Sequence, residues 1–190
     1  YGGTLRGHAH HAHQEGSPVS PQTPVTVLSG FLGSGKTTLL NQVLNHRGKK
    51  RIAVIVNDFS EVNIDAALIA EEGHLVRGED RFVELTNGCI CCTMREDLRE
   101  TLQMLSERRR EGALDFERVI IETTGMADPG PVAQTFFMDE AVATSYLLDA
   151  IVTLVDARHA LQQLDERLEA QRQVGFADQI FISKADLVDQ

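Results

Sequence analysis

The chain has 190 residues, of which 42% are hydrophobic and 24% charged, the composition of a folded globular protein. Its 28 acidic residues outnumber 18 basic ones, and the net charge of −10 argues against binding to nucleic acids or anionic membranes. No apolar run approaches the roughly 18 residues that span a bilayer, and three cysteines cannot form a disulfide framework, so we expect a cytoplasmic protein.

Two regions are expected. Residues 1–24 contain Gly, Ser, Pro and the run GHAHHAH, with little that could pack, and predict a disordered His-containing tail. Whether its histidines gather metal or form an idle polar tail stays open. Residues 25–190 predict one domain, and the ends at Tyr1 and Gln190 lead us to expect a fragment of a longer protein.

From residue 25 onward, short β-branched runs alternate with helical patterns. Strands are expected at residues 25–29, 52–56, 82–86, 118–122, 150–155 and 179–183. Three amphipathic helices are marked by apolar residues three and four apart: Leu39, Leu40, Val43 and Leu44; Met94, Leu98, Leu102 and Leu105; Leu161, Leu164 and Leu168. This alternation predicts an α/β fold, a mostly parallel sheet with helices on both faces.

The stretch from residue 30 to 40, GFLGSGKTTLL, matches the phosphate-loop pattern G-x-x-x-x-G-K-[ST] and joins a predicted strand to a predicted helix. Gly33 and Gly35 tolerate unusual dihedral angles, so successive backbone N–H groups can converge on an anion at the helix N-terminus. Lys36 is expected to reach the β- and γ-phosphates, and the Thr37 hydroxyl to bind Mg²⁺. We assign both a catalytic role.

A second nucleotide motif ends the strand expected at 118–122. Glu122 can hold Mg²⁺ or its waters, and Gly125, which follows it, lets a backbone amide approach the γ-phosphate. We therefore assign Glu122 a catalytic and Mg²⁺-binding role and Gly125 a nucleotide-binding role.

The base is indicated by Ser183-Lys184-Ala185-Asp186, close to the N/T-K-x-D signature of guanine-binding GTPases. Asp186 would accept hydrogen bonds from guanine N1–H and the exocyclic amine, a donor pair that adenine lacks, while the Lys184 stem lies along the base. Alone, this stretch reads equally well as a helix cap. After a phosphate loop it favours GTP.

All three cysteines lie within four positions, as Cys89, Cys91 and Cys92. We expect them to follow a strand through an Asn-Gly turn and to run into a helix that begins near Thr93, whose N-terminus would favour thiolates. Thiolates with a fourth ligand favour Zn²⁺, with Co²⁺ as a close mimic. A redox thiol pair and small buried hydrophobes remain alternatives.

Six motifs in order resemble the CobW-type family of P-loop GTPases, which are metallochaperones: GFLGSGKTTLL, NDFSEVNID, ELTNGCICCTMREDL, ETTGMADPGPVAQTFF, LLDAIVTLVDARHA and SKAD. The resemblance covers about residues 25–190. It implies a P-loop NTPase fold and a GTPase whose nucleotide state governs the binding and delivery of a transition metal, usually zinc.

The resemblance also implies site residues. Phosphate and Mg²⁺ contacts fall on Gly33, Ser34, Gly35, Lys36, Thr37, Thr38 and Glu122, base contacts on Lys184 and Asp186, and transition-metal ligands on Cys89, Cys91, Cys92 and Glu61. Three departures stand out. Val56 replaces a Glu that some members have, Ser183 replaces the Asn of the base motif, and we expect the C-terminal domain usual in the family to lie outside this fragment.

The function expected is therefore a GTP-hydrolysing metallochaperone with slow intrinsic turnover, which delivers zinc or Co²⁺ to a client metalloprotein. GTP would order the segment 57–65, with Asp58 near the γ-phosphate and Glu61 near the metal. Two alternatives stay open, a maturation GTPase with structural thiols and a zinc-storage or sensing module. A homodimer linked by a shared metal also stays open.

Overall fold

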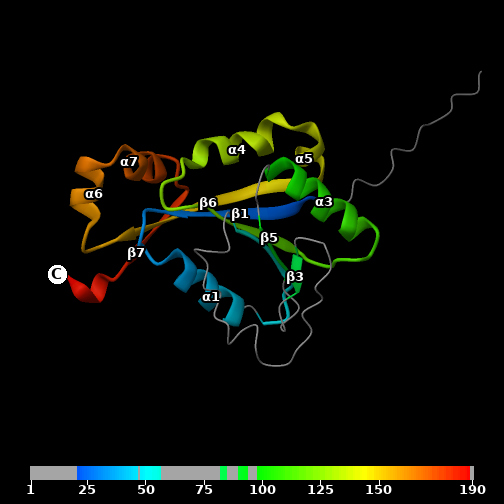
Figure 1. Ribbon diagram of the computed structural model, residues 1–190, viewed down its shortest axis with the longest axis horizontal. Helices are drawn as coiled ribbons and strands as arrows, with labels where there is room; N and C mark the ends of the chain where they lie inside the picture. The colour runs from blue at the N-terminus through cyan, green and yellow to red at the C-terminus, as the bar shows by residue number, and fades with distance from the viewer. Residues whose placement is uncertain (1–20, 47, 57–81, 85–89, 94–97, 189–190) are drawn as a thin grey trace, which may run out of the picture.

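The computed structural model describes residues 21–46, 48–56, 82–84, 90–93 and 98–188 (Figure 1). These residues form one seven-stranded sheet in the order β3-β4-β2-β5-β1-β6-β7. Its strands are β1 (Thr23–Gly30), β2 (Ile52–Val56), β3 (Phe82–Glu84), β4 (Ile90–Thr93), β5 (Arg118–Glu122), β6 (Tyr146–Asp156) and β7 (Gln179–Ser183). Every neighbouring pair is parallel except β3 and β4, which are antiparallel at one edge.

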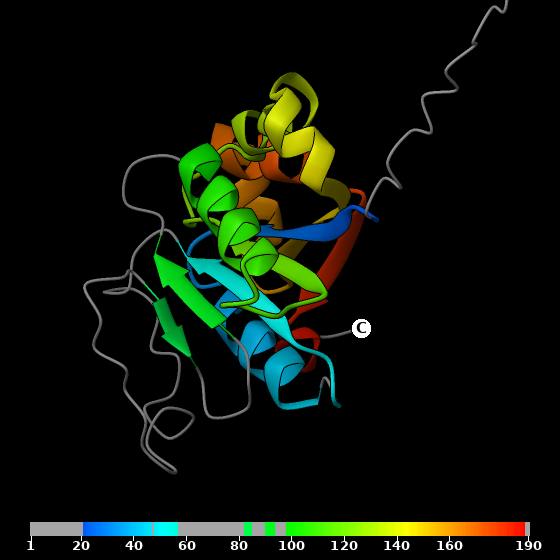
Figure 2. The same cartoon turned by 90° about the vertical axis from the view of Figure 1, so that its right-hand side faces the viewer.

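Helices cover both faces of the sheet, as the sequence predicts. In Figure 2 the sheet lies between α1 on one side and the remaining α-helices on the other. The helices are α1 (Lys36–His46), α3 (Leu98–Arg110), α4 (Pro129–Met138), α5 (Glu140–Ser145), α6 (Ala160–Glu166) and α7 (Leu168–Gly175), with a short 3₁₀ helix η1 (Ala185–Leu187). Across the described ranges, none of these helices combines the length and apolar character needed to cross a membrane.

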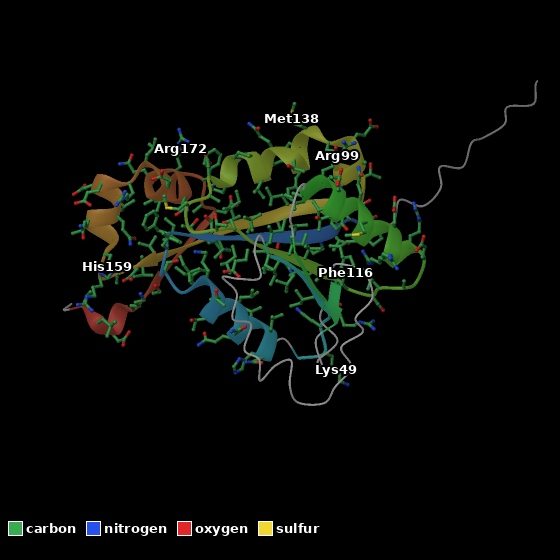
Figure 3. The ribbon with its side chains drawn as sticks, in the orientation of Figure 1. Lys49, Arg99, Phe116, Met138, His159 and Arg172 are labelled. Carbon is green, nitrogen blue, oxygen red and sulfur yellow. The ribbon has the colours of Figure 1, made fainter. Side chains whose placement is uncertain are left out.

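Successive side chains of a strand point to opposite faces of the sheet, so the buried side chains form two cores, one on each face. The first core packs α3, α4 and α5 on the sheet, and Phe116 is its largest fully buried side chain (Figure 3). The second core packs α1 on the opposite face, through Leu40 and Leu44. In β2 all five residues are buried, with Ala53 and Ile55 in the first core and the other three in the second. The central strands are thus held from both faces.

The expected fold class and the six expected strands are confirmed, but the sheet contains a strand that the sequence analysis missed. Ile90–Thr93 forms β4, and α3 begins at Leu98, so the expectation of a helix beginning near Thr93 is wrong. Parallel pairing with β2 and antiparallel pairing with β3 give this short segment its backbone hydrogen bonds, a long-range gain that local pattern does not reveal.

The third expected helix is two helices. Arg167 is extended, with φ −124° and ψ 112°, and it separates α6 from α7. Leu161 and Leu168 are 81% and 54% exposed, so their spacing does not mark a buried face. Two further helices, α4 and α5, were not expected. Asp128 and Asp139 cap them by accepting hydrogen bonds from Gly130 N and Val142 N.

Replacing Leu102 with alanine tests the first core. Leu102 is 0% exposed, so the change is expected to lower the free energy of unfolding by about 2–5 kcal/mol, measured by urea denaturation. The control is Leu161→Ala, at a position 81% exposed, which should change it by less than about 0.5 kcal/mol. Equal losses in the two variants would contradict this placement of α3.

Candidate nucleotide-binding site

The phosphate loop lies between β1 and α1, and its backbone requires glycine. Gly30, Gly33 and Gly35 have φ values of 144°, 72° and 98°, which side chains disfavour. A Cβ on Gly30 would lie 2.6 Å from the Leu154 carbonyl oxygen, so the loop packs closely on β6 as well. The loop therefore has the compact, glycine-dependent shape expected of an anion-binding turn.

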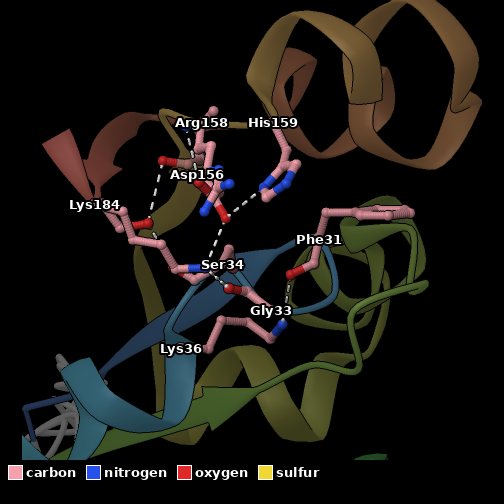
Figure 4. A network of polar contacts seen from close by, with 10 residues as sticks. Phe31, Gly33, Ser34, Lys36, Asp156, Arg158, His159 and Lys184 are labelled. Atoms are coloured by element: carbon pink, nitrogen blue, oxygen red, sulfur yellow. Dashed lines mark hydrogen bonds and ion pairs between the residues drawn. The ribbon is translucent and has the colours of Figure 1, made fainter. Parts of the chain in front are cut away.

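Lys36 is the first residue of α1 and is only 9% exposed. Its ammonium lies inside the loop and donates hydrogen bonds to the carbonyl oxygens of Gly30 at 2.7 Å and Phe31 at 3.3 Å (Figure 4). The Lys36 side chain therefore lies at the N-terminus of α1, where the helix dipole and free N–H groups favour an anion.

Thr37 and Glu122, expected to share Mg²⁺, are brought together. The Thr37 hydroxyl donates a hydrogen bond to Glu122 Oε1 at 3.1 Å. The contact forms because β5 lies beside β1, with Glu122 opposite Leu28, so its carboxylate meets the first turn of α1. Glu122 is 6% exposed. A hydroxyl and a carboxylate at this separation are the hard oxygen donors that suit Mg²⁺.

The segment after Glu122 turns back along the phosphate loop. Thr123 donates to the Leu28 carbonyl from both its N–H and its hydroxyl, at 3.1 and 3.2 Å. A turn follows, closed by the bond from Ala127 N to Thr124 O. Inside it, a Cβ on Gly125 would lie 2.7 Å from Leu32 N. Only glycine fits this contact, so Gly125 lies beside the phosphate loop.

The base motif contacts the same loop from β7. Ser183 donates to the Ser34 carbonyl at 2.6 Å, and Lys184 donates to the Gly33 carbonyl at 2.7 Å. Lys184 has φ 55°, the only positive φ outside glycine among the described residues. Asp186 follows in η1 and is exposed. The predicted phosphate, Mg²⁺ and base residues therefore meet at the carboxyl ends of parallel strands, where α/β folds bind ligands. Thr38, in the first turn of α1, is exposed.

Asp156, at the end of β6, is a site residue that the sequence analysis did not assign. It is 2% exposed, and its Oδ2 accepts from Lys184 Nζ at 2.6 Å and lies 3.0 Å from His159 Nδ1 (Figure 4). Its Oδ1 accepts from the Arg158 N–H at 2.9 Å. Burial alone would raise the pKa of Asp156, but these contacts, first that of Lys184, outweigh it and lower the pKa to about 2.

The signal for Asp156 was present in the sequence. An aspartate that ends an apolar strand, as in LVDARH, lies at the same sheet edge as the phosphate loop. What the sequence did not reveal is its partner, because Lys184 lies 28 positions further along the chain.

The thiol cluster is only partly described. Cys91 and Cys92 lie in β4, paired in register with Val54 and Ile55 of β2. Their expected place at a helix N-terminus is therefore wrong, because α3 begins at Leu98, beyond the strand. Cys89 and Glu61 lie outside the described residues, as do residues 1–20 of the tail expected over 1–24 and the segment 57–65. Residues 23 and 24 of that expected tail lie in β1. No cluster of three metal-ligating side chains occurs within the ranges the structure describes.

Comparison with known proteins gives close relatives. The zinc chaperone YjiA of Escherichia coli (strain K12) is 46% identical over 166 residues, which cover 87% of this chain and 50% of YjiA. The zinc-regulated GTPase metalloprotein activator 1 of Schizosaccharomyces pombe is 38% identical over 174 residues, 87% of this chain and 39% of that protein. The chain thus spans half or less of the length of these relatives.

The fold agrees with a solved structure. The crystal structure of the Zn(II)-bound YjiA GTPase from E. coli matches with a TM-score of 0.74 and 44% identity, over 88% of this chain and 51% of that one. Residues 24–190 match the family model described as CobW/HypB/UreG, nucleotide-binding domain. The phosphate loop, the Thr37–Glu122 contact and the base motif lie within that match. The chain therefore belongs to the CobW/HypB/UreG family of nucleotide-binding domains.

Proposed function

We propose that residues 25–190 bind and hydrolyse GTP as the nucleotide-binding part of a zinc metallochaperone. The observation that carries this proposal is the convergence of three motifs on one loop: Lys36 within it, Glu122 on Thr37, and Lys184 on Gly33. Relatives named zinc chaperone and zinc-regulated GTPase metalloprotein activator support the same reading.

The phosphates would lie in the loop from Gly30 to Lys36. Backbone N–H groups and the helix N-terminus would hold them, together with Ser34, Gly35 and Thr38, while the Lys36 ammonium would exchange its carbonyl partners for phosphate oxygens. Thr37 and Glu122 would hold Mg²⁺, which neutralises phosphate charge when bound. Gly125 would present its N–H to the γ-phosphate from the neighbouring turn.

The base would be selected by Asp186. Its exposed carboxylate follows Lys184, whose side chain is already held against the phosphate loop. A carboxylate at this position can accept both guanine donors, and adenine offers no such pair. Because Lys184 and Ser183 bond to the loop directly, base and phosphate sites form one unit, and little ordering would be needed on binding.

The transition metal would be cargo rather than a resident cofactor. Cys89, Cys91, Cys92 and Glu61 are the proposed ligands, and thiolates select zinc, with Co²⁺ as its mimic. A client metalloprotein in the cytoplasm would receive the metal, directly or through a metal-linked homodimer, and would accelerate an otherwise slow turnover. A Zn(II)-bound structure of a relative supports the choice of metal.

The sheet brings the two sites close together. Cys92 pairs with Ile55, and Ile55 pairs with Ile121, the residue before Glu122. Two strand spacings, about 10 Å, therefore separate the backbone of the thiol strand from that of the strand that carries Glu122. This distance allows nucleotide and metal to influence each other, and reciprocity requires the effect in both directions.

Asp186→Asn tests guanine selection. The amide cannot accept both guanine donors, so affinity for GDP should fall by about 10–100-fold, measured by fluorescence with a labelled nucleotide. Asp165→Asn, the same change at an exposed residue of α6, is the control and should bind as the unmodified protein does. Unchanged GDP affinity in Asp186→Asn would remove Asp186 from the base site.

Asp156→Asn tests the link between β6 and the base motif. The pKa of Asp156 falls from 3.8 to about 2 in the folded protein, so its carboxylate stabilises the fold above about pH 4 and this contribution is lost toward pH 2. The variant should lose about 2 kcal/mol of unfolding free energy at pH 7, and the deficit should shrink between pH 4 and 2.

The control for that experiment is Asp149→Asn. Asp149 forms an exposed pair with Arg118, so its loss should cost less than about 1 kcal/mol in urea titrations at the same pH values. A deficit for Asp156→Asn that stays constant from pH 7 to 2 would show that the ion pair with Lys184 does not stabilise the fold.

Co²⁺ titration tests metal binding. The thiolate-to-cobalt absorption band should appear with Mg²⁺ and GDP, tighten by at least about fivefold with a non-hydrolysable GTP analogue, and yield to Zn²⁺. Cys91→Ala should abolish the band, and Thr93→Ala in the same strand should keep it. An affinity that does not respond to bound nucleotide would favour the alternative, a maturation GTPase or zinc-storage module with structural thiols.

A further inference from the structure

We infer that Gln173, on α7, is a positioning residue that holds the turn carrying Gly125 in the orientation that admits the γ-phosphate. This inference rests on the proposed GTPase function and adds to it a residue outside the nucleotide motifs. Gln173 is 1% exposed and lies 48 positions from Gly125, on the helix that packs beside the start of α4 (Figure 1).

The Gln173 side chain holds two carbonyl groups of one turn. Its Nε2 donates to Gly125 O at 3.0 Å and to Ala127 O at 3.0 Å. A primary amide has two N–H donors, and both are used here. The third bond of the turn, from Ala127 N to Thr124 O, is internal. Three carbonyls of this irregular segment are thus tied down, two of them by Gln173.

Peptide planarity converts these bonds into an orientation of N–H groups. In a trans peptide the N–H points opposite to the preceding C=O. With Gly125 O directed to Gln173, the Met126 N–H points away from α7. With Thr124 O directed to Ala127 N, the direction of the Gly125 N–H is set in the same way. If the peptide between Gly125 and Met126 flipped, the Gly125 carbonyl would lose its hydrogen bond to Gln173. Its oxygen would then point away from α7, where the Met126 N–H now points, and a carbonyl oxygen repels phosphate.

Helix α7 can act as a support because it is bonded to the sheet through a contact that does not involve the turn. The Gln173 carbonyl accepts from the buried hydroxyl of Thr153 in β6 at 2.9 Å. On the same helix, Arg172 pairs with Asp128 at 3.2 Å, and Phe176, which caps the helix, packs so closely on Gly130 that a Cβ there would lie 3.0 Å from its ring. The segment from Gly125 to Gly130 is therefore packed against α7 and its cap.

The test compares Gln173→Ala with Gln171→Ala, the same change at an exposed glutamine two positions away that bonds only to Leu164 O at its neighbouring helix. Affinities for GDP and for a non-hydrolysable GTP analogue are measured with Mg²⁺, together with hydrogen exchange of residues 123–128. Gln173→Ala should lower the ratio of analogue to GDP affinity by about 5–100-fold, because two buried carbonyls lose their donors. In Gln173→Ala, the affinity for GDP should stay within about threefold of that of the unmodified protein, and hydrogen exchange of residues 123–128 should become faster. In Gln171→Ala, the affinity ratio, the GDP affinity and the hydrogen exchange should all be unchanged.

Gln173→Met keeps the approximate length of the side chain and removes both N–H donors, and it should reproduce the loss of the ratio if the alanine variant is too unstable to study. Equal losses for GDP and the analogue, an unchanged ratio, or a failure of both variants to fold would overturn the positioning role and leave the proposed GTPase function standing. If the unmodified protein bound neither nucleotide, both the proposed function and this inference would be overturned.

Discussion

The Lys184 ammonium is the contact on which the site depends, because it joins three separate parts of the chain. It bonds to the Gly33 carbonyl in the phosphate loop and to the buried carboxylate of Asp156 at the end of β6, while its own backbone follows β7. The carboxylate of Asp156 is buried and would be costly without a cation, whereas the Lys184 side chain is partly exposed to solvent. Asp156 therefore depends on Lys184, and together they hold the base motif beside the loop that takes the phosphates.

The phosphate loop and the turn after β5 are also held by single polar side chains. Lys36 donates hydrogen bonds to the carbonyls of Gly30 and Phe31, and Gln173 donates to those of Gly125 and Ala127. In both places a buried polar side chain replaces the hydrogen bonds that irregular backbone cannot make with itself. Lys36 belongs to α1 and Gln173 to α7, so the irregular segments proposed to contact the nucleotide are held by helices. The two side chains differ in that Lys36 could bind a phosphate directly, whereas Gln173 can only orient the backbone.

What the sequence predicted well was local. The phosphate loop is one short strand-glycine-helix pattern, and the apolar runs of β1, β2 and β5 are strands whose side chains are mostly buried between the two layers of helices. Thr37 and Glu122 could be paired because parallel strands end at one edge. The pairing of Asp156 with Lys184, the hold of Gln173 on Gly125 and the strand at Ile90–Thr93 depend instead on residues distant in sequence. The prediction of one helix with a buried face through Leu161 and Leu168 was wrong, because helical spacing alone does not show which face is buried.

The same sheet restricts how nucleotide and metal can be coupled. Cys92, Ile55 and Ile121 lie in one row across β4, β2 and β5, yet Ile55 and Ile121 are 0% exposed and packed in the first core. Close-packed strands of this kind do not shift by small continuous steps, so the strands themselves are unsuited to be the moving part. Among the described residues, the turn with Gly125 after β5 lies beside the phosphate loop, and it is bonded to Gln173 of α7 through two carbonyls. A hold of this kind suits the turn to orienting its N–H groups rather than to moving between two arrangements.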